Sequence, residues 1–207
     1  MLISFSELIA KYKINVTGIL HIGAHHCEEM QSYLHNHVSH LNIYWIEAIP
    51  AKVELMKSKG IKQIYQGVID EINDKEVIFN ITNNGESSSI LEFGTHEKNH
   101  PHVKIIDNIH TKTIRADTLI ENNNIPIEKL NFLNLDIQGV ELRALKSMEK
   151  YLHNIDYIYT EVNTEEVYKN CDKMQDITDY LSSFNFKLAD ARVYKKFGWG
   201  DAFYIKQ

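Results

Sequence analysis

The stretch GILHIGAHHCEE, Gly18–Glu29, decides the fold class of this chain. Its first half is apolar and long enough for a buried strand. After Gly23-Ala24-His25 it turns polar, and we expect a helix from about Cys27. A buried strand that ends in a small-residue turn and feeds a helix is how an open α/β sheet forms a ligand crevice. The small residues would let a ligand approach the backbone, and the helix N-terminus would offer it free N–H groups.

Two nucleotide-binding patterns are missing from this stretch. It contains neither the P-loop pattern Gly-x-x-x-x-Gly-Lys-Ser/Thr nor the dinucleotide pattern Gly-x-Gly-x-x-Gly. A pyrophosphate is therefore not expected to be the main anchor of the ligand. The chain also lacks a Tyr-x-x-x-Lys pair, which disfavours a nicotinamide-dependent dehydrogenase.

The composition is that of an ordinary globular protein. The chain has 207 residues, 43% of them hydrophobic and 24% charged, which suits a single domain over residues 1–207. A net charge of −6 disfavours a nucleic-acid partner, and the two cysteines, Cys27 and Cys171, provide no disulfide framework. We find no signal peptide and no apolar run of about 18 residues, so we expect no membrane span and a cytoplasmic location.

Strand-like and helix-like segments alternate along most of the chain, which predicts an α/β fold with a mostly parallel sheet covered on both faces. Beyond the first strand, the expected strands are Leu41–Ile46, Ile61–Ile69, Glu76–Ile81, Ile109–Ile114, Phe132–Leu135 and Ile155–Val162, followed by Phe186–Val193 and Ala202–Ile205. The last two are too close for a crossover helix and must form an antiparallel hairpin. The expected helices are an N-terminal one within residues 1–13, added as an appendage, and Cys27–His37, Ala51–Lys59, Asp117–Asn122, Val140–Met148 and Met174–Phe184. Residues Thr82–Asn108 read as a long loop or lid.

A second informative stretch is LNFLNLDIQGVE, Leu130–Glu141. Asp136 stands at the end of a buried strand, and Gly139 permits the turn into the next helix. Asp136 is then either an active-site carboxylate or a cap for that helix. Glu161, at the end of a later strand, has the same two interpretations. The serine run Ser87–Ser89 is more typical of turns than of ligand contacts.

Together these stretches resemble the FkbM-type methyltransferases, a family of the Rossmann-like class I methyltransferases that use S-adenosylmethionine. The resemblance runs from Thr17 to the end of the chain, and Asp136–Glu141 is its most specific part. The matching stretches are HIGAHHCEE (His21–Glu29), WIEAIP (Trp45–Pro50), GESSSIL (Gly85–Leu91), TIRADTL (Thr113–Leu119), LNLDIQGVELRALKS (Leu133–Ser147) and GDAFYIK (Gly200–Lys206). The resemblance implies a doubly wound sheet and S-adenosylmethionine as the cofactor.

The resemblance also implies site residues. In it, Glu47 would accept hydrogen bonds from the ribose hydroxyls, and Asp70 would bound the adenine. Asp136 and Glu161 would be the catalytic carboxylates, with Asp136 orienting the acceptor hydroxyl, removing its proton or holding the ammonium group of the cofactor. The full set expected to bind the cofactor is His21, Gly23, Ala24, His25, Glu47, Ala48, Asp70, Asp136 and Gln138.

The resemblance suggests O-methylation of a hydroxyl on a sugar, a glycan or a small molecule, with acceptor contacts from Asn83–Asn108 and the N-terminal helix. Two departures support an alternative, a catalytically degenerate methyltransferase fold that only binds: His21 replaces an acidic residue of the family, and Cys27 replaces a glycine. No metal site is predicted, because the histidines lack a His-Glu-x-x-His frame. Whether Asp136 and Glu161 hold a divalent ion stays an open question at this point.

Overall fold

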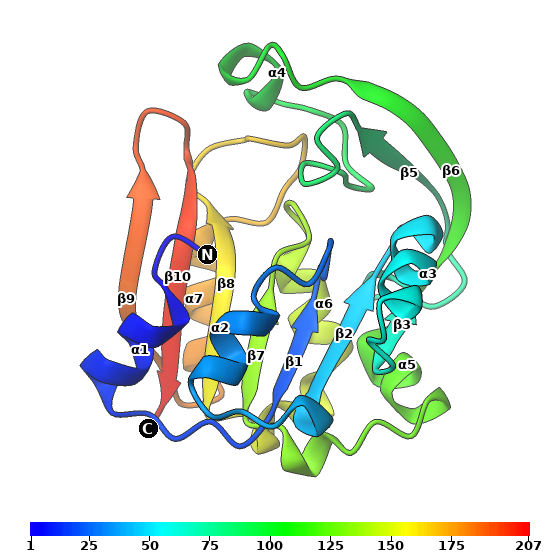
Figure 1. Ribbon diagram of the computed structural model, residues 1–207. Coiled ribbons are helices and arrows are strands. Elements are labelled where there is room, and N and C mark those ends of the chain that lie inside the picture. Colours follow the sequence, from blue (N-terminus) through cyan, green and yellow to red (C-terminus); the bar gives the residue numbers. More distant parts are fainter.

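The computed structural model describes residues 1–207 and is built on a seven-stranded sheet in the order β3-β2-β1-β7-β8-β10-β9 (Figure 1). Strands β3 to β8 in this order are parallel, and β10 pairs antiparallel with both β8 and β9. The predicted doubly wound, mostly parallel Rossmann-like sheet with a closing antiparallel hairpin is therefore confirmed. The bounds are β1 Ile19–Ile22, β2 Ile43–Glu47, β3 Ile64–Gln66, β7 Phe132–Leu135, β8 Tyr157–Asn163, β9 Phe186–Tyr194 and β10 Trp199–Lys206.

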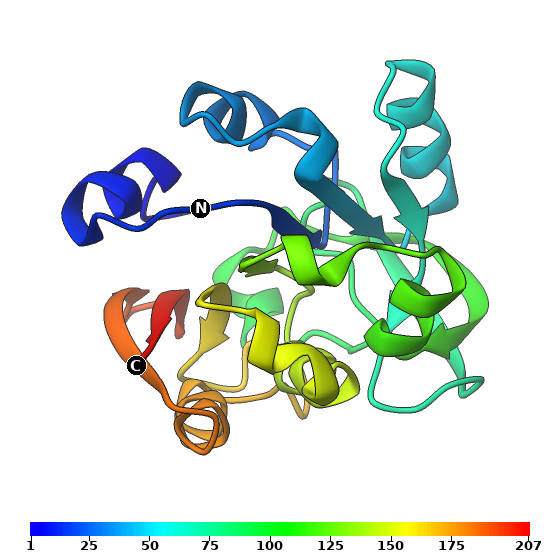
Figure 2. The same cartoon turned by 90° about the horizontal axis from the view of Figure 1, so that it is seen from below.

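Helices cover both faces of this sheet (Figure 2). On one face lie α1 (Phe5–Tyr12), α2 (Met30–His35) and α3 (Pro50–Ser58), and on the other lie α5 (Ala116–Asn122), α6 (Glu141–Ser147) and α7 (Met174–Ser182). Short 3₁₀ turns at His40–Asn42, Ile127–Lys129 and Glu149–Asn154 connect them. The turn at His40–Asn42 delays the second strand, which begins at Ile43 rather than at Leu41 as predicted.

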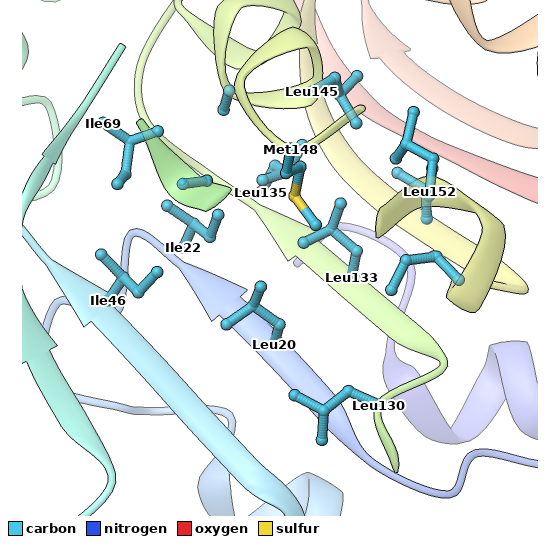
Figure 3. Close-up of a cluster of buried hydrophobic side chains, with 14 of the residues drawn as sticks. Leu20, Ile22, Ile46, Ile69, Leu130, Leu133, Leu135, Leu145, Met148 and Leu152 are labelled. Atoms are coloured by element: carbon cyan, nitrogen blue, oxygen red, sulfur yellow. The ribbon is translucent and has the colours of Figure 1, made fainter. Parts of the chain in front are cut away.

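The alternating side chains of the central strands fill two separate cores. In β1, Ile19 packs against the face of α1, α2 and α3, while Leu20 and Ile22 point to the opposite face. Leu133 and Leu135 of β7 join Leu20 and Ile22 in the larger core, shown in Figure 3. Side chains that are apolar on both faces are what a central parallel strand requires.

The N-terminal helix contributes to the core. Phe5 and Leu8 of α1 are buried, and the ring of Phe5 lies 4.8 Å from that of Tyr33 and 5.2 Å from that of Phe132. Ser4 caps the helix by accepting a hydrogen bond from the backbone N–H of Glu7. This packing makes α1 an integral layer rather than an appendage. No helix in the structure has the length and apolar content that crossing a bilayer requires.

The prediction of one strand over Ile61–Ile69 is wrong. The chain bends at Gly67, where a Cβ atom would lie 2.4 Å from Leu119. Strand β3 therefore ends at Gln66 in the main sheet, and β4 (Val68–Ile69) starts a second sheet. This sheet has the order β4-β6-β5, with β5 at Glu76–Thr82 and β6 at Ile105–Ile114.

Two further predictions need correction. The helix expected from Cys27 begins only at Met30, because residues 23–29 form turns in which His25 and Cys27 have positive φ. The loop expected over Thr82–Asn108 is shorter, since β6 already starts at Ile105 and a helical turn, α4 (His96–Asn99), lies within it.

Candidate active site

A cavity of about 570 Å³ lies at the carboxyl ends of the central strands. It opens where the strand order reverses between β1 and β7, which is the point at which open α/β sheets bind ligands. Its volume falls in the range of about 300–1,000 Å³ that is usual for small-molecule sites. Segments from both sheets line it, including the first turn, the end of β2, the loop before α4, and the ends of β7, β8 and β10.

The first turn is shaped by close backbone contacts. Gly23 has φ +96°, and a Cβ atom there would lie 1.8 Å from the carbonyl oxygen of Asp136, so only glycine fits. The N–H groups of Gly23 and Ala24 donate to the carbonyl of Ile46 at 2.9 and 3.0 Å, and that of Cys27 donates to Ala24. These N–H groups are therefore not available to a ligand. The helix whose N-terminus was expected to offer free N–H groups starts three residues later, at Met30, so that N-terminus does not lie in this turn.

Glu47 lies at the end of β2 and lines the cavity. One carboxylate oxygen accepts the N–H of His25 at 2.7 Å, and the other accepts the N–H of Ile49 at 2.8 Å. Burial raises the pKa of Glu47, while these hydrogen bonds and the Lys52 ammonium act in the opposite direction. Each oxygen keeps a second lone pair, so the carboxylate can accept two more hydrogen bonds without moving.

His21 belongs to the floor of the cavity. Its Nδ1 lies 3.1 Å from the hydroxyl of Tyr33, and its ring stacks on Trp45 at 4.7 Å. Burial lowers the pKa of His21 to about 4, so the ring is neutral near pH 7. His21 therefore supplies a hydrogen-bonding floor and no negative charge.

Asp136, Gln138 and Glu161 form one connected group. The amide nitrogen of Gln138 donates to Asp136 at 2.6 Å and to Glu161 at 2.8 Å. The hydroxyl of Tyr168 in turn donates to the amide oxygen of Gln138 at 2.5 Å. Asp136 does not cap the following helix, since none of the N–H groups of α6 donates to it. The N–H of Arg143 in the first turn of α6 donates to Asp172 at 3.2 Å, and Glu141 accepts the N–H groups of Ile137 and Gly139 in the turn before the helix.

The three carboxylates near this group differ in exposure. Asp136 is open to the cavity, while Glu161 and Asp201 are buried. Desolvation inside the cleft, and then the neighbouring Asp201, raise the pKa of Asp136 to about 6. Burial and the nearby Asp136 also raise the pKa of Glu161. Asp201 accepts hydrogen bonds from the hydroxyl of Tyr159 and from the N–H of Leu2.

The ammonium of Lys52 is the one Lys or Arg cation that lines the cavity, and it donates to the carbonyl of Gly85 at 3.0 Å. One group of three potential metal ligands, His25, His26 and Glu28, lies at the rim, with ligand atoms within 4.8 Å of one another. The amide of Gln138 already stands between Asp136 and Glu161, in the position that a shared cation would take.

The sequence matches a known protein family over most of its length. The family described as "Methyltransferase FkbM domain" matches residues 21–188. The chain belongs to this family. A relative in Haloferax volcanii, a hexuronic acid methyltransferase named AglP, is 32% identical over 78 residues. That match covers 38% of this chain and only 30% of the relative.

Solved structures support the fold of this FkbM-family chain. Magnesium protoporphyrin IX methyltransferase of Synechocystis PCC 6803, solved with bound SAM, superposes with a TM-score of 0.50 at 8% identity, over 98% of this chain and 76% of that one. An uncharacterised protein of Listeria monocytogenes also reaches a TM-score of 0.50, at 10% identity, over 97% of this chain and 66% of that one.

The structure brings most of the expected site residues of this FkbM-family chain together. Those that line the cavity are His21, Gly23, His25, Glu47, Ala48, Asp136, Gln138 and Glu161. Two others do not line it. The methyl group of Ala24 is buried in the core, and the carboxylate of Asp70 is paired with Lys75 at 3.0 Å.

Sequence reasoning missed Tyr168 and Asp201 as members of the site. Tyr168 lies in an irregular segment after β8, where no periodic pattern marks it. Asp201 did have a signal, because it is part of the GDAFYIK stretch and is the one charged residue near the start of an otherwise apolar strand.

Proposed function

We propose that this chain is an S-adenosylmethionine-dependent O-methyltransferase that acts on a hydroxyl group of a sugar, a glycan or a small molecule. The observation that carries the proposal is that one cavity joins the Glu47 carboxylate to the Asp136–Gln138–Glu161 group. The FkbM family supports methylation, and the hexuronic acid methyltransferase supports a sugar as acceptor.

The residues present fit the cofactor. Glu47 has two free acceptor positions for the ribose hydroxyls, and Ala48, Ile49, Val68 and Ile69 give an apolar flank for the adenine, in place of the expected Asp70. Gly23 and His25 border the space for the amino-acid end. The carboxylates of the cavity favour a positively charged ligand. When bound, S-adenosylmethionine supplies a methyl group that its sulfonium makes electrophilic.

Asp136 is the proposed general base. Of Asp136, Glu161 and Asp201, it is the one that is open to the cavity, and a pKa of about 6 leaves it ionised at neutral pH and able to accept the proton of an acceptor hydroxyl. Gln138 fixes its orientation through a 2.6 Å hydrogen bond. Glu161 holds the other side of the same amide, so we assign it a positioning role, whereas the resemblance implied that Glu161 is a second catalytic carboxylate. The cavity walls align the reactants and exclude water.

The substitution Glu47→Gln tests the cofactor end. It removes the charge but can keep one backbone hydrogen bond, whereas Glu47→Ala would leave the N–H groups of both His25 and Ile49 without their acceptor. Hydrogen bonds to charged groups contribute about 1.5–3 kcal/mol, so we expect affinity for S-adenosylmethionine to fall by about tenfold to a hundredfold in isothermal calorimetry.

Glu54→Gln is the matched control, because Glu54 lies on the exposed side of α3 and its loss should leave the affinity unchanged. Equal affinities of Glu47→Gln and the unmodified protein would remove Glu47 from the site. No binding of S-adenosylmethionine at millimolar concentration would overturn the proposed function. Tight binding without transfer to any hydroxyl compound would favour the degenerate binding module.

A further inference from the structure

The end of the cavity beyond Asp136 is built from rings. His96, His100, Tyr168 and Trp199 line it, and we refer to these four residues as the acceptor wall. The ring of His96 lies 4.9 Å from that of His100 and 5.4 Å from that of Tyr168. Tyr168 also donates to Gln138, so the wall stands next to the proposed base. A methyl acceptor has to lie between this wall and Asp136.

The wall is held in place by backbone hydrogen bonds. The segment before α4 pairs with the segment after β8: the N–H of Gly94 and that of His96 donate to the carbonyl of Val167, and the N–H of Thr95 donates to that of Glu166. Behind His96, the ring of Phe93 stacks in parallel with a centroid distance of 4.4 Å. Figure 1 shows α4 beyond the upper ends of the central strands. His96, the first residue of α4, lines the cavity.

His96 is buried without a partner for its polar ring. It is 6% exposed, and its Nδ1 atom has no hydrogen-bond partner. Burial, followed by the charges of His100 and His102, lowers the pKa of His96 to about 4, so the ring is neutral. Nδ1 is fully buried and therefore out of reach of a ligand in the cavity. The other ring nitrogen, Nε2, also has no hydrogen-bond partner within the protein, and it is the atom available to a bound acceptor, because His96 lines the cavity.

The charges of the cavity restrict the acceptor further. Asp136, Glu161 and Asp201 gather at this end, with Glu29 beside them. The Lys52 ammonium is bound to Gly85, near Glu47 at the cofactor end. The Met1 ammonium also lines the cavity, but it lies 4.0 Å from Glu29 and balances that carboxylate. An acidic acceptor would bring one more negative charge against Asp136 without a free cation to balance it, which costs affinity.

We propose that the acceptor is a neutral sugar, whose apolar C–H face stacks on the acceptor wall while one of its hydroxyl groups bonds to His96. This inference rests on the proposed function and makes it more specific. The acceptor then differs from that of the Haloferax relative, whose name specifies a hexuronic acid. Ring faces suit the C–H face of a sugar, and the neutral imidazole selects for a hydroxyl partner.

The test measures methyl transfer by mass spectrometry with the full chain and S-adenosylmethionine. The acceptors are the methyl glycosides of glucose, galactose and mannose, the matching glycosides of glucuronic and galacturonic acid, and catechol as a flat phenol. We expect transfer to at least one neutral hexoside, with kcat/KM about tenfold or more above that of its uronic acid. A preference for the uronic acids or for catechol would overturn the inference, as would the absence of transfer to any sugar.

The cofactor affinity separates the two possible failures. If calorimetry shows that S-adenosylmethionine binds and no neutral sugar is methylated, this inference fails and the proposed function stands. If S-adenosylmethionine does not bind, the proposed function fails first and the inference falls with it.

The variant His96→Phe tests the hydrogen bond. It keeps a flat ring against Phe93 and removes the ring nitrogens, so we expect KM for the sugar to rise about tenfold with kcat and the affinity for S-adenosylmethionine unchanged. His110→Phe, at an exposed position on β6 away from the cavity, is the matched control. An unchanged KM in His96→Phe would remove His96 from acceptor recognition.

Discussion

At the scale of single residues, the surroundings of Asp136 are the reason that we propose it as the base. It shares the end of the cavity with Asp201 and Glu161, and it is the one of the three that faces open space. Desolvation in the cleft, and then Asp201, raise its pKa to about 6. A base in this environment is ionised at neutral pH but holds a proton more readily than an ordinary aspartate, which suits proton removal.

This environment predicts the pH dependence of the reaction. Asp136 works as a base only when deprotonated, so kcat/KM for the acceptor should rise with pH, level off above pH 7 and have its midpoint near pH 6. Asp201→Asn removes a neighbouring negative charge that raises the pKa of Asp136, so the midpoint should move to lower pH. Asp136→Asn should lower kcat by about a hundredfold or more while S-adenosylmethionine still binds. A rate that is independent of pH between 5 and 8, measured in initial-velocity assays, would argue against a carboxylate base.

His21 and Cys27 show what single residues reveal before a structure is known. Both depart from the family pattern, and the structure accommodates both. His21 is neutral and bonded to Tyr33, and the tight turn holds Cys27 at φ +55°, a conformation that favours glycine. The departures were visible in the sequence. Their partners were not, because Tyr33 comes from a different element.

At the scale of elements, the segment around α4 positions the acceptor wall, and Gly94 is its tightest point. A Cβ atom on Gly94 would lie 2.1 Å from the carbonyl oxygen of Glu166, so Gly94→Ala must push this segment away from the loop after β8. We expect a loss of about 1–3 kcal/mol of stability in denaturant unfolding, the usual cost of overpacking. KM for the acceptor should rise, and the affinity for S-adenosylmethionine should not change.

Thr95→Val is the control for this substitution, because it lies in the same segment and removes a buried hydroxyl that has no partner. It should change the free energy of unfolding by less than about 1 kcal/mol, because no hydrogen bond is lost. If Gly94→Ala changed cofactor affinity as much as acceptor KM, the segment would belong to both ends of the cavity.

The elements also show where sequence patterns suffice. Strands with apolar residues on both faces, such as β1 and β7, were predicted, since their pattern is continuous and their turn residues are distinctive. The division of Ile61–Ile69 at Gly67 was not predicted, because the segment reads as one strand. A Cβ atom on Gly67 would lie 2.4 Å from Leu119, a residue far along the chain, so the local sequence does not reveal why glycine is needed there. The lining of the cavity shows the same difference: residues at strand ends, such as Glu47 and Asp136, were predicted to lie there, and Tyr168 in an irregular segment was not.

At the scale of the whole molecule, the two sheets share a boundary that also forms the cofactor end of the cavity. Ile49, at the start of α3, packs there against Val68 of β4 and Phe79 of β5, two strands of the second sheet. The polypeptide crosses from one sheet to the other at Gly67, and residues on both sides of this crossing line the cavity. We propose that residues 1–207 therefore behave as one domain.

This arrangement predicts a single cooperative thermal transition that shifts with the cofactor. A ligand that binds only the native state stabilises it by about 2.7 kcal/mol at a hundred times its Kd. For a chain of this size each kcal/mol raises Tm by about 2–4 °C, so saturating S-adenosylmethionine should raise Tm by roughly 5–10 °C. NAD should have no effect, because the first turn has no free N–H groups for a pyrophosphate. Glu47→Gln should reduce the shift, and Asp136→Asn should retain it. Two separate transitions, of which only one moved with the cofactor, would mean that the second sheet unfolds independently and that the cavity does not couple the two halves.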